Sequence, residues 1–256
     1  MTALWKSRAL AAGVVAFVMA PALAWADDLN CPTPPADPLL EFLSPPPCDS
    51  CAEAKVEMDE LRTIERNRTE AQAKHALADY EISVTRFLDG ADIKFDAAAF
   101  AKCKPFFDKF SEKTKAAAEH AKDAFCRRRP YNVPGNDLQP LQTGKNSPSY
   151  PSGHTTYGAA IGAVLAQMVP EKRAILYARS ADYGHSRMVA GVHYRSDVEA
   201  GKLLGLEVAT EAFARDDAFR SAFPDAARCV REALGLAPDV PKDAPQAAVE
   251  APAPKP

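Results

Sequence analysis

The chain has little that would place it in a membrane or in a β-sheet. Beyond the N-terminus, no apolar run approaches the roughly 20 residues that a helix needs to cross a bilayer, and strand-like alternation of apolar and polar residues is nearly absent. Repeats and glycine-rich linkers are missing as well. The formal net charge of −3 excludes the strongly basic surface of a nonspecific nucleic-acid binder. We therefore expect a soluble protein with no membrane span and no nucleic-acid scaffold role.

The N-terminus has the sequence features of an export signal. Lys6 and Arg8 precede an apolar stretch from Ala9 to Ala20, and Ala24-Trp25-Ala26 fits a small-residue cleavage site. We expect residues 1–26 to be a signal peptide and the remaining chain to be periplasmic or secreted. The alternative is an uncleaved N-terminal anchor.

The rest of the chain divides by composition. Residues 27–50 are rich in proline and should form an extended, non-helical arm. Residues 237–256 consist mainly of Ala and Pro, so that we expect a disordered tail. Residues 51–236 between them should form one helical domain.

Apolar residues within this domain recur at spacings of three and four, which predicts helices. The fold class is therefore all-α, a bundle whose helices stabilise one another by packing. The predicted helices cover residues 52–77, 79–88, 96–110, 111–128, 154–168, 171–185, 194–213 and 216–234.

The cysteines follow the expected signal peptide, and their even number suggests disulfides in an exported protein. Six cysteines allow 15 pairings, and the sequence does not choose among them. Cys48 and Cys51 have the spacing of a redox or zinc motif, although a structural bridge is the preferred interpretation. The six are Cys31, Cys48, Cys51, Cys103, Cys126 and Cys229.

Three clusters of residues are candidates for chemistry. In the first, Lys122 precedes Arg129-Pro130 by seven residues, which would place both cations on one helix face about 10 Å apart. In the second, Ser152-Gly153-His154 precedes a predicted helix, whose free N–H groups would face an anion. Each cluster also has an ordinary explanation, namely a solvated basic helix end and a capped helix start.

The third cluster contains Arg187, His193 and Asp197. One helical turn separates the histidine from the carboxylate, which would fix the imidazole tautomer and stabilise positive charge on the ring. A surface ion pair is the alternative. Taken together, the three clusters supply three cations, two histidines and one acid, which suits phosphoryl transfer without a metal.

In this order, the clusters match the pattern K-x6-R-P, P-S-G-H and S-R-x5-H-x3-D. The chain thereby resembles the superfamily of type 2 phosphatidic acid phosphatases and vanadium haloperoxidases, from near Pro45 to about Leu204. Within it, Ser149 to Thr155 is similar to the signature of class A bacterial nonspecific acid phosphatases. Pro148 and Tyr131 depart from that signature, where glycine and phenylalanine are usual, which leaves substrate preference open.

The resemblance implies a helical acid phosphatase that hydrolyses phosphate monoesters of small molecules without a cofactor, inhibited by vanadate as a phosphate mimic. It implies that His193 is the nucleophile, that Asp197 orients it, and that His154 is the general acid and base. The resemblance also favours a homo-oligomer, such as a homodimer. It further implies that the phosphoryl oxygens are bound by Lys122, Arg129, Ser152, Gly153 and Arg187.

Other interpretations remain at this stage. A vanadate-dependent haloperoxidase would use the same cations, a lipid phosphatase would need membrane spans, and a non-catalytic phosphate-binding protein would not need both histidines. We interpret His185 as a rim or surface residue, and His75 and His120 as exposed.

Overall fold

A computed structural model describes residues 37, 40–143 and 147–240 of the chain. These residues form an all-α fold without β-strands, as predicted. None of their helices combines the length and the apolar character that crossing a bilayer requires. The α-helices are α1 (Ala52–Asn67), α2 (Glu70–Ala78), α3 (Val84–Gly90), α4 (Ala97–Ala101), α5 (Lys104–Phe125), α6 (Gly153–Met168), α7 (Arg173–Val189), α8 (Arg195–Arg215) and α9 (Asp217–Ala233). Two 3₁₀ turns, η1 (Pro130–Asn132) and η2 (Pro170–Lys172), complete the set.

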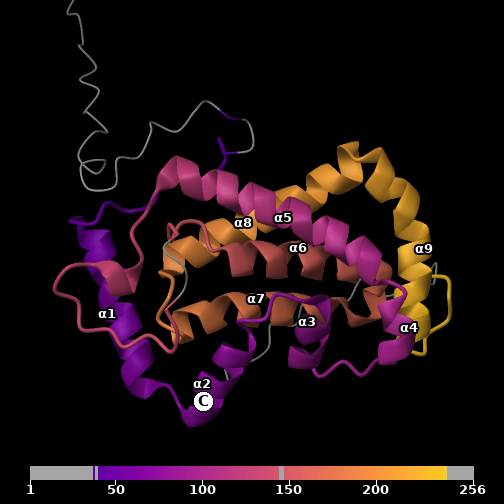
Figure 1. Cartoon of the computed structure of the whole chain (residues 1–256), viewed down its shortest axis with the longest axis horizontal. Helices are drawn as coiled ribbons and strands as arrows, with labels where there is room; N and C mark the ends of the chain where they lie inside the picture. Colours follow the sequence, from indigo (N-terminus) through magenta and orange to yellow (C-terminus); the bar gives the residue numbers. More distant parts are fainter. Residues whose placement is uncertain (1–36, 38–39, 144–146, 241–256) are drawn as a thin grey trace, which may run out of the picture.

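Helix α6 is the centre of the bundle. Its sequence is apolar on almost every face, and nearly all of its side chains are buried, as expected for a helix that is surrounded by protein. It packs against α5, α7 and α8, and it lies between α5 and α7 in Figure 1. The start of α6 is the Ser152-Gly153-His154 segment, so the most buried helix of the fold fixes that segment in place.

Helix α8 approaches α6 closely because two of its positions carry no side chain. A Cβ atom on Gly205 would lie 2.2 Å from the carbonyl oxygen of Thr156, and one on Gly201 would lie 2.6 Å from that of Ser152. Both neighbours are backbone atoms, which cannot move aside without displacing α6. The two glycines therefore set the distance between the two helices.

Two disulfides are described. Cys103 at the start of α5 is bonded to Cys229 in α9, which joins segments 126 residues apart in sequence. Cys48 is bonded to Cys51, directly before α1. Cys126 is disulfide-bonded too, and Cys31 lies outside the described residues.

The predicted helix at residues 52–77 is interrupted. Arg68 is extended and Thr69 begins α2 with a capping box, in which its side chain accepts from the N–H of Gln72 and the side chain of Gln72 accepts in return. The guanidinium of Arg68 donates to the carbonyl oxygens of Gln139 and Val189. The apolar spacing on which the prediction rests does not show this break.

Other predicted helix boundaries were wrong as well. The helix predicted at residues 79–88 begins instead at Val84, because the side chain of Ser83 caps its first turn. The boundary predicted between residues 110 and 111 does not exist, since α5 continues through it and ends at Phe125. The prediction of a helix to residue 128 fails at Cys126, which adopts a left-handed conformation with φ of 48°.

The proline-rich arm is only partly described. Its described residues contain no helix, and Leu40 and Leu43 are buried in the main core. The phenolic hydroxyl of Tyr150 donates to the carbonyl oxygen of Ser44. The expected signal peptide, and residues 241–256 of the expected tail, lie outside the described residues.

The close approach of α8 to α6 gives a stability prediction. Replacing Gly205 with Ala should lower the free energy of unfolding by about 1–3 kcal/mol, because overpacking forces the two helices apart. Thermal unfolding of the purified protein measures this change. Lys202→Ala is the matched control, since Lys202 lies exposed on the same helix and its loss should change stability by less than about 0.5 kcal/mol. Equal stability of Gly205→Ala and wild type would contradict the packing argument.

Candidate functional site

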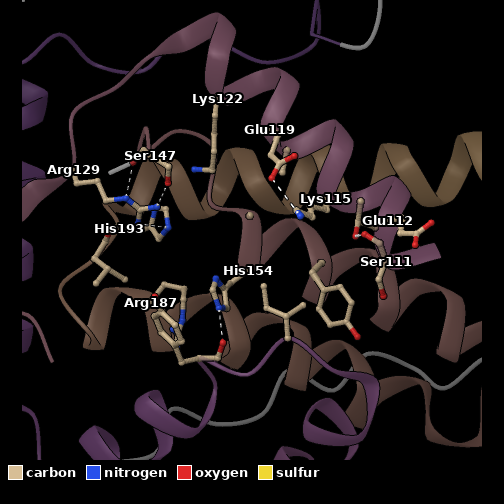
Figure 2. A pocket seen from close by; sticks show the side chains of 17 residues that line it. Ser111, Glu112, Lys115, Glu119, Lys122, Arg129, Ser147, His154, Arg187 and His193 are labelled. Carbon is tan, nitrogen blue, oxygen red and sulfur yellow. Dashed lines mark hydrogen bonds and ion pairs between the residues drawn. The ribbon is translucent and has the colours of Figure 1, made fainter. Parts of the chain in front are cut away.

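The three predicted clusters meet at one cavity of about 460 Å³, bordered by α5, the start of α6, the end of α7 and the segment before α8. Figure 2 shows that the side chains of Lys122, Arg129, His154, Arg187 and His193 converge on it from these elements. They are far apart in sequence, so only the folded chain brings three cations and two imidazoles together.

His193 is buried and held at both ring nitrogens. Its Nδ1 lies 3.2 Å from Oδ2 of Asp197, and its Nε2 lies 3.0 Å from a terminal nitrogen of Arg129. A guanidinium can only donate, so Nε2 accepts there and carries a lone pair, while Nδ1 carries the proton. Burial, followed by the charge of Arg129, lowers the pKa of His193 well below its ordinary value. The ring is therefore neutral, with its nucleophilic nitrogen on the side of Arg129.

Asp197 is fully buried at the start of α8. Besides His193, it accepts hydrogen bonds from the hydroxyl of Ser149 and, at 2.9 Å, from the backbone N–H of Tyr194. Burial alone would raise the pKa of Asp197, but the hydrogen bond with His193 and the charge of Arg127 hold it well below its ordinary value. A permanently charged carboxylate can thus stabilise positive charge that develops on the imidazole.

Arg127 was not among the predicted site residues, but it contacts Asp197. Its guanidinium is buried and donates to Oδ1 of Asp197 and to Oε2 of Glu57, both at 2.7 Å. It also lies 3.9 Å over the ring of Tyr194. The other carboxylate oxygen of Glu57 accepts from the backbone N–H of Ser196 at 2.6 Å. Glu57, Arg127 and Asp197 therefore form a chain of alternating charges, and Asp197 at its end contacts His193.

Lys122 and Arg129 reach the cavity by different routes than predicted. Lys122 lies on the last full turn of α5, but that helix ends before Arg129, so the two do not share a helix face. The ammonium of Lys122 donates to the carbonyl oxygens of Pro148 and Ser149 at 2.6 and 3.2 Å. Burial, with the charge of Arg129 as the second cause, lowers the pKa of Lys122 to about 7.

Arg187 is anchored by hydrogen bonds on one side of its guanidinium. The end of its guanidinium donates to the hydroxyl of Ser186 and to the carbonyl oxygen of Ala76 in α2. Its other terminal nitrogen, Nη1, is buried and has no hydrogen-bond partner among the described residues. Because a buried guanidinium without a partner is costly, and because Arg187 lines the cavity, this nitrogen is suited to an anion.

The start of α6 presents backbone donors. The hydroxyl of Ser152 caps the helix by accepting from Thr155, and the N–H of Ser152 donates to the carbonyl oxygen of Asp197 at 2.9 Å. Ser152 is fully buried and does not line the cavity. Its hydrogen bonds instead fix the position of the start of α6. Gly153 and His154 do line it, at the helix end where the dipole favours an anion.

His154 is oriented by a backbone carbonyl. Its Nε2 lies 3.1 Å from the carbonyl oxygen of Tyr80 and must donate to it, which leaves Nδ1 for exchange of a proton. The ring also packs against that of Tyr80, with centroids 5.5 Å apart. Burial, then the charge of Arg187, lowers the pKa of His154 to about 3.

The remaining histidines lie outside this cavity. His185 and His120 are exposed, as predicted. His75 is half-buried rather than exposed, and its Nε2 lies 2.9 Å from Oδ2 of Asp182. Among the described residues, His75, Asp79 and Asp182 are grouped closely enough to hold a metal ion, but Arg86 and Arg179 already neutralise Asp79.

Residues 114–219 match the family model described as the PAP2 superfamily. This segment contains all eight predicted site residues. Through this segment the chain is similar to the PAP2 superfamily.

Part of the chain is also similar to an acid phosphatase. The chain is 36% identical over 92 residues to the non-specific acid phosphatase of Salmonella typhimurium, which covers 35% of this chain and 37% of that protein. The similarity thus spans little more than a third of that relative.

Two solved structures at 20% identity are also similar. One is a transmembrane PAP2 type phosphatidylglycerolphosphate phosphatase from Bacillus subtilis, with a TM-score of 0.47 over 63% of this chain and 85% of that one. The other is a bacterial vanadium-dependent iodoperoxidase, with a TM-score of 0.48 over 66% of this chain and 51% of that one.

The lowered pKa of His154 predicts how stability depends on pH. Between pH 6.5 and about 3 the unfolded chain binds a proton at this position and the folded chain does not, so stability falls as the pH falls through this range. The contribution is on the order of 1 kcal/mol per pH unit. His154→Gln should therefore lose less stability than wild type between pH 6.5 and pH 4 in chemical denaturation.

The matched control is His185→Gln, which removes an exposed histidine outside the cavity and should keep the wild-type slope. Identical slopes for His154→Gln and wild type would show that His154 is not held neutral in the folded protein.

Proposed function

We propose that this protein is an exported acid phosphatase that hydrolyses phosphate monoesters through a phosphohistidine on His193, without a metal. The observation that carries the proposal is the arrangement at His193: a neutral imidazole faces a cavity that also receives Lys122, Arg129 and the partnerless nitrogen of Arg187. The acid phosphatase similarity supports the same activity.

The phosphoryl group would be bound before it reacts. Its oxygens would accept from Nη1 of Arg187, from Arg129 and Lys122, and from the N–H groups at the start of α6. In moving to a phosphoryl oxygen, Arg129 would release the lone pair of His193 Nε2. The dianion also brings opposite charge next to Lys122 and His154, which raises the pKa of both groups.

The first step would form the P–N bond between phosphorus and Nε2 of His193 and break the ester P–O bond. His154, protonated in the presence of the dianion, would give the proton on Nδ1 to the leaving oxygen. Positive charge on the His193 ring would be stabilised by Asp197, to which Nδ1–H donates.

In the second step His154 would act as a general base instead of a general acid. His154, now neutral, would take a proton from water through Nδ1 while the water oxygen attacks phosphorus. The P–N bond breaks, and its electron pair returns to Nε2 of His193. The products are an alcohol and inorganic phosphate, and both histidines regain their starting protonation when the phosphate leaves.

Variants of the two histidines test the proposal. His193→Ala should abolish turnover of p-nitrophenyl phosphate, because no nucleophile remains. His154→Ala should slow hydrolysis by roughly 10²–10⁴-fold for an alkyl phosphate, whose leaving group needs a proton, and by less for p-nitrophenyl phosphate. Steady-state kinetics measure both, and orthovanadate should inhibit competitively while EDTA should not.

His185→Ala is the matched control and should keep wild-type rates, since this histidine lies outside the cavity. Substantial activity of His193→Ala would refute the assignment of His193 as the nucleophile. Bromination with orthovanadate and peroxide, in the absence of phosphatase activity, would instead identify a haloperoxidase. Phosphate binding without either reaction would identify a non-catalytic phosphate-binding protein.

A further inference from the structure

The cavity extends well beyond the space that a phosphoryl group needs. From Lys122 it follows one face of α5 past Glu119 and Lys115 to Glu112 and Ser111. Eleven residues of helix correspond to about 16 Å, and Figure 2 shows these side chains in a row leading away from the histidines. This outer half of the cavity has room for the alcohol part of a substrate.

Part of the cavity lining is aromatic and apolar. Tyr80 and Ile82 line the cavity although they are 36% and 49% exposed, and the buried Tyr157 also lines it. The ring of Tyr80 packs beside that of His154. Since His154 must reach the leaving oxygen, the group attached to that oxygen lies next to the Tyr80 ring. A flat aromatic group can stack there.

The charges of the outer half differ from those at the histidines. Glu112 and Glu119 contribute two carboxylates, and Lys115 contributes one ammonium, which lies 3.8 Å from Glu119. The phosphoryl end is cationic and the outer end is net negative. A second anionic group on the substrate would be repelled there by a like charge.

We infer that the outer half, lined by Tyr80, Ile82, Glu112, Lys115 and Glu119, is a leaving-group site for aromatic alcohols that carry no second anionic group. This inference rests on the proposed phosphatase function. The preferred substrates are accordingly monophosphates of uncharged or cationic aromatic alcohols, and diphosphates and bisphosphates are poor substrates.

A matched pair of substrates tests the charge preference. Wild type should hydrolyse phenyl phosphate with a kcat/KM roughly tenfold above that for 4-carboxyphenyl phosphate, and Glu112→Gln combined with Glu119→Gln should reduce this ratio several-fold. Glu232→Gln, an exposed carboxylate on α9, is the control and should keep the wild-type ratio. An unchanged ratio in the double variant would overturn the inference.

Tyr80→Ala tests the aromatic part of the lining and leaves the backbone carbonyl that holds His154. It should lower kcat/KM for phenyl phosphate by roughly tenfold while affecting methyl phosphate much less. Equal losses on both substrates would overturn the stacking role. Failure of the proposed function would look different, because wild type would then hydrolyse none of these esters.

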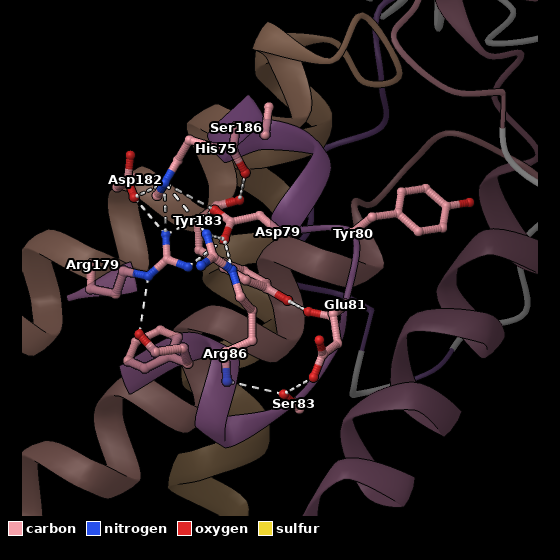
Figure 3. Close-up of polar contacts among 12 residues, drawn as sticks. His75, Asp79, Tyr80, Glu81, Ser83, Arg86, Arg179, Asp182, Tyr183 and Ser186 are labelled. Atoms are coloured by element: carbon pink, nitrogen blue, oxygen red, sulfur yellow. Dashed lines mark hydrogen bonds and ion pairs between the residues drawn. The ribbon is translucent and has the colours of Figure 1, made fainter. Parts of the chain in front are cut away.

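A separate observation concerns the buried ion cluster below the site. Asp79 at the end of α2 is fully buried and accepts from both terminal nitrogens of Arg179 in α7, at 2.5 and 2.8 Å, and from Arg86 in α3 at 2.8 Å. Figure 3 shows how these side chains, with His75 and Asp182, join three helices.

The segment fixed by this cluster carries two carbonyl groups that hold site residues. The carbonyl oxygen of Ala76 accepts from Arg187, and that of Tyr80 accepts from His154. Asp79 lies between them in sequence. A third contact, from the hydroxyl of Tyr183 to the carbonyl oxygen of Glu81 at 2.6 Å, ties the same segment to α7.

We also propose that Asp79 is a positioning residue for the general acid, acting through the Tyr80 carbonyl. This proposal likewise rests on the phosphatase function. Loss of its charge frees Arg86 and Arg179, and the turn that orients the His154 ring then shifts. The effect falls on proton donation to the leaving group, and therefore on substrates that need it.

Asp79→Asn should reduce turnover of methyl phosphate at least tenfold more than that of p-nitrophenyl phosphate. Asp182→Asn is the control, because this half-exposed carboxylate belongs to the same cluster but not to the segment that holds His154, and it should keep the wild-type ratio. Arg86→Lys weakens the same cluster with charge retained and should shift the ratio in the same direction, which provides the test if Asp79→Asn does not fold. Wild-type ratios in the folded variants would overturn the proposal.

Discussion

The buried carboxylate of Asp197 is the interaction on which the site depends. It orients His193 through Nδ1, pairs with Arg127, and accepts from Ser149 and from the N–H of Tyr194. The carbonyl oxygen of the same residue accepts from the N–H of Ser152. One residue thus joins the start of α8 to the start of α6, where the two histidines of the site are placed. Removing a partner from such a buried ionic network typically costs several kcal/mol.

The site also has an excess of positive charge. Lys122, Arg129 and Arg187 line one cavity, and the two imidazoles there are kept neutral by burial and by these cations. A bound dianion would offset this excess of positive charge and favour protonation of His154. Affinity for the phosphoryl group and readiness of the general acid would then have one physical origin. In the proposed mechanism, this coupling would allow His154, whose pKa is otherwise low, to donate a proton.

Much of this could be predicted from the sequence, because spacing reports local geometry. One turn between His193 and Asp197 was enough to foresee their contact, and helical periodicity was enough to identify the all-α fold. What failed depended on tertiary contacts. Arg127 was not predicted as a site residue, since nothing in the local sequence shows that Glu57, 70 residues away, is its ion-pair partner. The contact between His154 and the carbonyl oxygen of Tyr80 could not be predicted, because every residue type has a backbone carbonyl group.

The account is tested most directly by a crystal structure of the protein with orthovanadate. We expect vanadium bonded to Nε2 of His193, with its oxygens contacting Nη1 of Arg187, the guanidinium of Arg129 and the ammonium of Lys122, and with Nδ1 of His154 facing the apical oxygen. Vanadate bound elsewhere, or bound here without a bond to His193, would contradict the arrangement on which the account depends.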